Sequence, residues 1–190
     1  MAKRVYILLS MLLTVAVAAH SSSLDTKKPT AEDTLDQLED QLATAEGPER
    51  VYLLGKAARA ALAAGESEKA GEYAAKALEG AADFPKDWNY GNVIHHGNLV
   101  LGQIALAKGD LDGAVKRLLQ AGQTPGSPQL DTFGPNMALA KALLEHGKTE
   151  PVLEYLELCR RFWEHPEKID RWKRAIENGS VPDFGANLRY

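Results

Sequence analysis

Cysteine is almost absent from this sequence of 190 residues, which contains Cys159 alone. Small exported domains that rely on disulfides carry an even, spaced set of cysteines, so this class of scaffold is excluded and the fold must depend on side-chain packing. Cys159 lies between Leu158 and Arg160 in a segment with helical apolar periodicity. This setting favours a buried free thiol, with an intermolecular disulfide as the alternative.

Strand patterns are also scarce. Aromatic residues make up only 7% of the sequence, and they do not alternate with polar residues as a half-buried strand requires. From Ala31 onward the chain is instead rich in Ala, Leu, Glu and Lys, which favour helices. The sequence therefore predicts an all-α protein.

A strongly basic surface is missing as well. The formal net charge is −4, and the lysines and arginines do not form a run. A mildly acidic protein without a basic cluster is a poor binder of nucleic acid or of an anionic membrane surface. We therefore expect no nucleic-acid partner.

The short motifs that usually carry enzyme chemistry do not occur. There is no HExxH, CxxC or GxSxG pattern. Residues 122–128 contain glycines, but their prolines remove the backbone donors that a phosphate-binding loop uses, which favours a linker. His95 and His96 are adjacent, so on a helix they point about 100° apart and cannot hold one metal ion as an i, i+4 pair would. We expect no cofactor, no metal site and no catalytic residues.

What the sequence does contain begins with an apolar N-terminal stretch. Lys3 and Arg4 precede an uncharged run over 5–19 that ends in small residues. This pattern predicts a signal peptide over 1–19, removed on export, and a flexible polar linker over 20–30. A retained membrane anchor is the alternative, although the run is shorter than the roughly 20 apolar residues of a spanning helix. The mature protein is thus expected to be periplasmic or secreted, with no membrane span.

A helical domain over 31–180 and a C-terminal tail over 181–190 are expected to follow. Glycines and prolines divide the domain into eight helices, with Thr30 or Asp33 capping the first. The predicted helices run from this cap to Gly47, over 49–64, 67–79, 87–109 and 111–121, from Asp131 or Thr132 through Pro135 to Gly147, and over 150–164 and 167–178.

A weak repeat joins these helices into pairs. A glycine separates the two helices of each pair at Gly65, Gly109 and Gly147, where it takes the turn at low steric cost. Each glycine has small or apolar residues at matching positions on both sides. These are Ala57, Ala58, Ala61, Ala70, Ala74, Ala77 and Leu78 in the first unit, Leu101, Gly102, Ala105, Ala114, Leu118 and Ala121 in the second, and Leu139, Ala140, Leu143, Val152, Leu156 and Cys159 in the third.

This skeleton resembles the tetratricopeptide repeat over about residues 49–166. Asn98 and Ala105 replace the Trp and Tyr of that family's first helix, and insertions must be accommodated near 85–93 and 122–132. The segment 124–137 is also similar to exported bacterial repeat proteins of uncharacterised function. The resemblance implies a short α-solenoid of about three antiparallel helix pairs, with an N-terminal helix and a C-terminal capping helix.

The family resemblance also implies where a partner would bind. Tetratricopeptide arrays typically bind extended peptides in a concave groove lined by the first helix of each pair. In this sequence the groove-facing positions are Tyr52, Arg59, His96, Gln103, Met137 and Lys141. Arg59, Gln103 and Lys141 are equivalent in the three units, so a polar ladder with two positive members is expected.

Two features qualify this expectation. Gly55, Val100 and Ala138 occupy several positions of the family's carboxylate clamp, so clamp binding of a partner's terminal carboxylate is not inferred. The helix that begins near residue 31 could itself fill the groove with Leu35, Leu38 and Leu42.

Three hypotheses for function remain open. The first is a non-enzymatic interaction module or scaffold in the cell envelope that binds a protein or peptide. The second is an enzyme or metal-binding protein whose site is assembled from scattered His, Asp and Glu residues. The third is an accessory domain of an envelope complex that packs against a membrane protein. Aromatic residues such as Trp88, Tyr90, Phe162, Trp163 and Trp172 are interpreted as core or capping residues, with a ligand-binding cluster as the alternative.

Overall fold

The computed structural model describes residues 30–189, so the expected signal peptide and nearly all of the expected linker lie outside the described part. The elements of the described part are all helical, which confirms the all-α prediction. They are α1 (Ala31–Leu42), α2 (Gly47–Ala63), α3 (Ser67–Ala81), α4 (Tyr90–Ala107), α5 (Leu111–Gly122), α6 (Pro128–Phe133), α7 (Ala138–Glu145), α8 (Thr149–Cys159), α9 (Pro166–Glu177) and a short 3-10 helix, η1 (Gly185–Leu188). Between residues 30 and 189 no helix has both the length and the apolar character needed to cross a membrane.

Local sequence signals explain most helix ends. Thr30 caps α1 through a capping box, in which its hydroxyl accepts from the Asp33 amide (3.1 Å) and the Asp33 carboxylate accepts from the Thr30 amide (2.9 Å). Gly65, Gly109 and Gly147 follow α2, α4 and α7, and each has a positive φ that a residue with a side chain rarely adopts. The glycines between paired helices therefore have the turning role that the sequence predicts.

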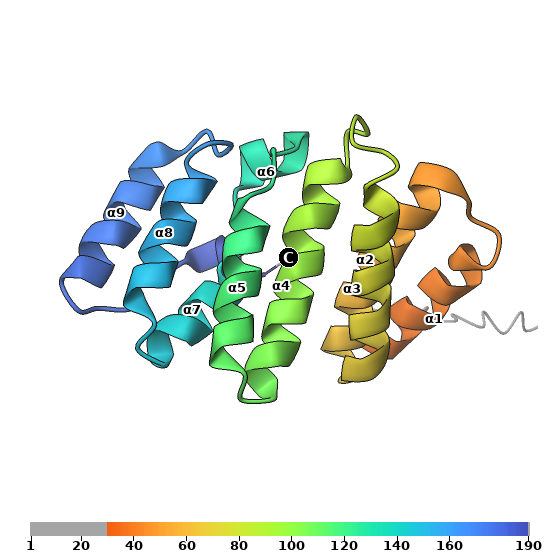
Figure 1. The fold of residues 1–190 in the computed structure, drawn as a ribbon, viewed down its shortest axis with the longest axis horizontal. Coiled ribbons are helices and arrows are strands. Elements are labelled where there is room, and N and C mark those ends of the chain that lie inside the picture. The colour runs from red at the N-terminus through yellow and green to blue at the C-terminus, as the bar shows by residue number, and fades with distance from the viewer. Residues whose placement is uncertain (1–29, 190) are drawn as a thin grey trace, which may run out of the picture.

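The helices stand side by side from α1 at one end of the molecule to α9 at the other (Figure 1). The most extensive contacts join α2 to α3 and α4 to α5, and α3 also packs closely on α4. Fully buried alanines, among them Ala57, Ala61, Ala74 and Ala114, fill these contacts. Small side chains let helix axes approach closely, so shape rather than large apolar volume specifies the pairing in this half.

The C-terminal half has a different core. Large side chains dominate it, including Tyr155, Trp163, Trp172 and Phe184, all of which are buried. Trp172 stacks on Trp163 with ring centroids 5.3 Å apart and meets Phe184 edge-on at 5.0 Å. Cys159 lies in the same core as a buried free thiol, as the sequence favours, and burial raises the pKa of this thiol.

The structure has two helices, α6 and α7, where the sequence predicts one. The sequence favours a single helix from Asp131 or Thr132 to Gly147, but the polypeptide forms α6 and α7 with a break over 134–137. Gly134 takes φ 85° and ψ −175°, a conformation open almost only to glycine. A β-carbon there would lie 2.3 Å from the Trp163 ring. The helix therefore stops because the Gly134 backbone packs directly against an indole, a tertiary contact that the local sequence does not show.

The segment 181–190, expected to be a tail, packs against this break as far as it is described. Phe184 inserts into the aromatic core, and η1 follows it. The Asn187 side-chain amide donates to the carbonyls of Phe133 (3.1 Å) and Pro135 (2.9 Å), and the Asn187 carbonyl accepts from the Met137 amide (2.8 Å). The C-terminal residues thus satisfy the backbone groups that the break leaves without helical partners.

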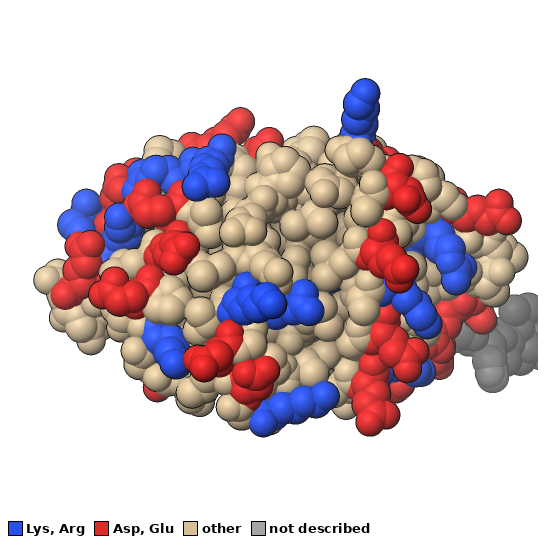
Figure 2. All heavy atoms as spheres, in the orientation of Figure 1, with Lys and Arg blue, Asp and Glu red and all other residues tan. Residues whose placement is uncertain are grey.

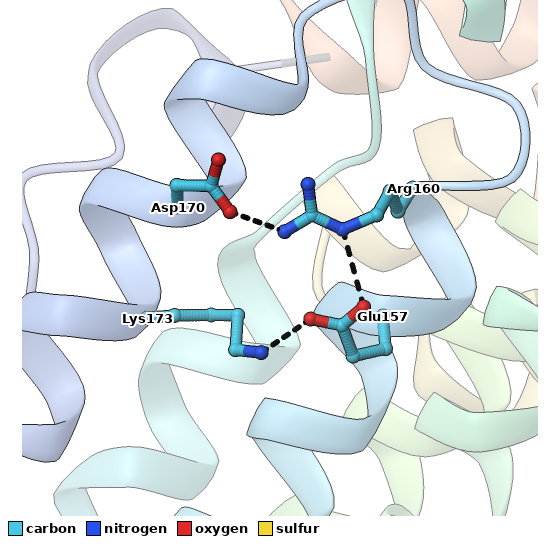
Figure 3. A network of polar contacts seen from close by, with 4 residues as sticks. All are labelled: Glu157, Arg160, Asp170 and Lys173. Carbon is cyan, nitrogen blue, oxygen red and sulfur yellow. Dashed lines mark hydrogen bonds and ion pairs between the residues drawn. The ribbon is translucent and has the colours of Figure 1, made fainter.

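Charged side chains cover both ends of the face seen in Figure 1 and also lie over α5 and the lower part of α4. Figure 2 shows mixed acidic and basic groups over α8 and α9 at one end and around α1 to α3 at the other, with a mostly uncharged area around α6. Figure 3 shows the network that joins α8 to α9, in which Arg160 contacts both Glu157 and Asp170 and Lys173 contacts Glu157. Partly exposed ion pairs of this kind each contribute at most about 1 kcal/mol, so the aromatic core supplies the main contact.

Candidate binding groove

Two adjoining pockets follow the helices α2 and α4. The first, which we name the aromatic pocket, has a volume of about 380 Å³ and is lined by Tyr52, Gly55, Lys56, Arg59, Asn89, Asn92, Val93, His96, Gln129, Leu130, Phe133 and Ala186. The second, the Gln103 pocket, has a volume of about 330 Å³ and is lined by Arg59, Leu62, Ala63, His96, Leu99, Val100, Gln103, Asn136, Ala138 and Leu188. Arg59 and His96 belong to both, and we call the two pockets together the groove.

Four of the six positions chosen from sequence line the groove. Tyr52 lies in the aromatic pocket, Gln103 lies in the Gln103 pocket, and Arg59 and His96 lie where the two meet. Tyr52 and Arg59 are seven residues apart on α2, as are His96 and Gln103 on α4, so each pair lies about two helical turns apart on one face. The helical register of α2 and α4 therefore brings these four side chains together.

The other two positions do not reach the groove, which corrects the expected ladder. Met137 is fully buried in the C-terminal core. Lys141 lines neither pocket and pairs with Glu145 one turn further along α7. The reason is the break over 134–137. Because α7 begins only at Ala138, its residues do not take the positions at the groove that the repeat alignment with α2 and α4 predicts. Of the two positively charged residues expected in the ladder, only Arg59 lines the groove.

Arg59 is the unusual group of the groove. Its Nε atom is buried and has no hydrogen-bond partner within the described part of the protein. Burial lowers the pKa of the guanidinium, but an arginine stays charged at any physiological pH. The ion pairs formed between residues 30 and 189 do not include Arg59. Within residues 30–189, a partly buried positive charge therefore faces the groove without a compensating carboxylate.

The two histidines beside it do not add to this charge. The buried His95 ring donates through Nδ1 to the Ala121 carbonyl (3.1 Å) and accepts through Nε2 from the Asn136 amide (3.1 Å), which fixes the neutral tautomer. Burial, reinforced by the nearby Arg59 charge, lowers the pKa of His95 to about 4. The pKa of His96 is also lowered, by burial first and then by His95 and Arg59. Both rings are thus uncharged at neutral pH.

One wall of the aromatic pocket consists of carboxamides. Asn92 on α4 donates to the side-chain oxygens of Asn89 (2.7 Å) and Gln129 (2.7 Å), and its own oxygen accepts from Ser127 (2.7 Å). Thr124 adds a bond to the Gly91 carbonyl (2.8 Å). Residues 122–128, which the sequence indicates as a linker, are in this way fixed onto the start of α4.

Two partly exposed aromatic side chains, Tyr52 and Phe133, line the same pocket, and a third, Trp88, lies next to Tyr52. Tyr52 is 37% exposed, Trp88 55% and Phe133 65%. The Tyr52 and Trp88 rings lie 6.1 Å apart, and the Lys56 ammonium lies 5.3 Å from the Tyr52 ring centre. Phe162, Trp163 and Trp172 are buried as interpreted, whereas Trp88 is not a core residue.

Sequence reasoning missed the carboxamides and Phe133. Asn92 and Gln129 are 37 positions apart, and Phe133 reaches the pocket from α6. The signal that pointed toward them was the density of Gly, Pro, Ser and Gln over 122–136, which marks a segment with its own local bonding rather than a plain connection.

Helix α1 does not fill the groove. Leu35, Leu38 and Leu42 are buried, and α1 packs on α2. None of its residues lines either pocket. The described part of the protein therefore leaves the groove open to a second molecule.

Residues 30–189 contain no group of three His, Cys, Asp or Glu side chains that lie close enough together to hold a metal ion.

Comparisons with protein-family models, with curated proteins and with solved structures find no match for this sequence.

Proposed function

We propose that this protein is a non-enzymatic interaction module that binds an extended segment of a partner protein in the groove. Three helix pairs support this reading: α2 with α3, α4 with α5, and α7 with α8, each turned by a glycine of positive φ. Such pairing is the arrangement that a tetratricopeptide-like α-solenoid would have. The signal-peptide pattern over 1–19 supports an exported protein, so the proposed site of action is the periplasm or the exterior of the cell.

The observation that carries the proposal is Arg59, whose buried Nε has no hydrogen-bond partner within residues 30–189. Among residues 30–189, Lys56 and Arg59 are the lysines and arginines that line the two pockets, and no Asp or Glu of that range lines either. The protein as a whole has a net charge of −4, so this local excess of positive charge runs against the composition. A carboxylate from a partner would supply the acceptor that the Arg59 Nε lacks, and charge-assisted bonds to arginine are among the stronger ones in proteins.

A displayed library of random peptides tests this proposal. The purified protein should enrich peptides that contain Asp or Glu. Binding of the enriched peptides should fall about tenfold or more in Arg59→Gln, because hydrogen bonds to charged groups contribute about 1.5–3 kcal/mol. Lys141→Gln is the matched control, since Lys141 lies outside the groove.

Circular dichroism of both variants should match that of the original protein, which excludes loss of folding as the cause. Failure to enrich any peptide above the support alone would overturn the proposal. So would enriched peptides that bind Arg59→Gln as tightly as the unaltered protein.

A further inference from the structure

The aromatic pocket and Arg59 lie within one groove but offer two different chemistries. Resting on the proposed function, we infer that the groove recognises an acidic residue directly followed or preceded by an aromatic residue in the partner segment. The acidic side chain binds at Arg59, and the aromatic ring enters the aromatic pocket between Tyr52 and Phe133. This pair of adjacent residues is the recognised feature.

The size and the edge of the aromatic pocket suit a ring. Its volume of about 380 Å³ lies within the roughly 300–1,000 Å³ of pockets that bind small ligands. Tyr52 and Phe133 line the pocket and are partly exposed, and the exposed Trp88 lies beside Tyr52, whereas the large aromatic residues of the C-terminal core are buried. An entering ring can meet Tyr52 and Phe133 edge-on or offset-stacked, which adds about 0.5–1.5 kcal/mol per pair to the gain from burial. The pocket therefore favours an aromatic side chain over a small one.

The distribution of charge argues for a single carboxylate rather than a polyanion. His95 and His96 are neutral at neutral pH, so the floor offers one arginine and not a basic cluster. Lys56 lies over the Tyr52 ring at the pocket opening and can contribute to a second, weaker contact. One guanidinium matches the two oxygens of a carboxylate in a bidentate pair. Asp or Glu is thus the matching side chain.

The carboxamide wall gives the pocket a fixed shape. Asn92 is bonded at both its nitrogen and its oxygen, to Asn89, Gln129 and Ser127. These bonds tie α4 to the start of α6, so the wall does not have to be ordered when a ligand enters. Preorganised sites avoid part of the entropic cost of binding, which lets a short motif suffice.

Capped tetrapeptides test the motif, with Trp88 as the reporter. The probe is acetyl-Gly-Asp-Phe-Gly-amide, and the controls replace Asp by Asn or Phe by Ala. Trp163 and Trp172 are buried, so Trp88, at 55% exposure, is the tryptophan placed to respond to a ligand in the aromatic pocket. We expect a saturable change in tryptophan emission with the probe, absent in Trp88→Phe. We expect each control peptide to bind about tenfold more weakly, or about 1.4 kcal/mol.

A double-mutant cycle assigns the carboxylate contact. Arg59→Gln should weaken the Asp-Phe peptide about tenfold and leave the Asn-Phe peptide nearly unchanged, while Lys141→Gln should alter neither. A general loss of folding would weaken both peptides equally, so this pattern separates contact from structure. Isothermal calorimetry on Trp88→Phe should still detect the Asp-Phe peptide.

The outcomes distinguish the inference from the proposed function beneath it. If displayed peptides bind in an Arg59-dependent way but Asn-Phe or Asp-Ala tetrapeptides bind as well as Asp-Phe, the motif is wrong and the groove proposal stands. If the library enriches nothing and no tetrapeptide gives a saturable signal up to its solubility limit, both are wrong. Equal weakening of the Asp-Phe and Asn-Phe peptides by Arg59→Gln also overturns the carboxylate assignment.

Discussion

At the residue scale, His95 is the polar side chain that joins the groove to the core. Its two ring nitrogens link α4 to the last turn of α5 and to the break over 134–137, through Ala121 and Asn136. Both partners are backbone groups. The ring therefore supplies a hydrogen-bond donor to the buried Ala121 carbonyl and an acceptor to the buried Asn136 amide. A neutral imidazole can do this, whereas a protonated ring has two donors and would lose the bond from Asn136.

This geometry predicts a loss of stability in mild acid. The pKa of His95 lies at about 4 in the folded protein, against an ordinary value of 6.5. Below pH 6.5 the unfolded state binds a proton that the folded state refuses, so stability is full above that pH and falls toward pH 4. Between pH 7 and pH 5 we expect about 2 kcal/mol of the free energy of unfolding to be lost through His95. Urea unfolding at the two pH values measures it.

His95→Gln provides the comparison. This variant should be less stable at pH 7, because the groups at Ala121 and Asn136 lose well-placed partners, at about 1–3 kcal/mol for each unsatisfied group. Its further loss on going to pH 5 should be smaller by about 2 kcal/mol than that of the original protein. Identical pH dependence in the two proteins would mean that another group, such as His96, governs the acid response.

At the scale of helices, close approach of backbones is a feature of the contacts that α4 makes with its neighbours. Gly102 on α4 shows it best, because a β-carbon there would lie 2.4 Å from the Leu139 side chain and 3.1 Å from that of Arg117. Gly55 on α2 is also within a helix, yet a β-carbon there would meet no atom within 4 Å. The two glycines differ in surroundings and not in secondary structure.

Replacing each by alanine should therefore change stability in opposite directions. Gly55→Ala should stabilise the protein by about 0.5–1 kcal/mol, the usual gain in helix propensity. Gly102→Ala has the same propensity gain but must displace Leu139, and overpacking of this kind costs about 1–3 kcal/mol. Chemical denaturation of both variants gives the difference. Equal stabilisation by the two substitutions would show that α4 does not approach α5 and α7 this closely.

The sequence is enough to place most helices, and the physical reason is visible in the turns. Gly65, Gly109 and Gly147 have a local conformation that needs glycine, so they mark helix ends without knowledge of the fold. Gly134 could not be recognised in this way, because Pro135 after it fits the first turn of a helix equally well. The helix break at Gly134 depends on the packing of the Trp163 ring against the Gly134 backbone. These two residues are far apart in the sequence.

The same limit applies to the groove. Tyr52, Arg59, His96 and Gln103 are the positions that the tetratricopeptide resemblance implies within α2 and α4, and they line the groove because each of these helices is unbroken. Met137 lies in the break and Lys141 after it, where the repeat register no longer predicts the direction of a side chain. The carboxamide wall depends on bonds across more than thirty residues, such as that between Asn92 and Gln129, and has no signature in the local pattern.

At the scale of the whole molecule, the C-terminal residues complete the packing of the aromatic core. Phe184 is 2% exposed and lies against Trp172, whose Nε1 donates to the Asp183 carbonyl (3.3 Å). Ala186 and Leu188 line the aromatic pocket and the Gln103 pocket respectively. This segment thus belongs both to the core and to the groove.

Phe184→Ala should accordingly cost about 3–5 kcal/mol, the usual range for removal of a buried aromatic ring. Val181, three residues earlier, is 46% exposed, so Val181→Ala should change stability by no more than about 0.5 kcal/mol. Thermal or urea unfolding of the pair provides the measurement. A Phe184→Ala variant as stable as Val181→Ala would show that residues 181–189 do not contribute to the core.

The bonds between Asn187 and the break have a consequence for how the protein is made. They join residues 52 and 54 positions apart, and the earlier partners, Phe133 and Pro135, are translated first. At roughly 5–20 residues per second, a ribosome needs about 3–10 s to cover that distance. When this interval begins, the nascent polypeptide already contains α1 to α6, whereas Ala186 and Leu188, which line the groove, have not yet been added. The groove is therefore complete only after Ala186 and Leu188 have been added, and a growing polypeptide does not present the finished groove to a partner before then.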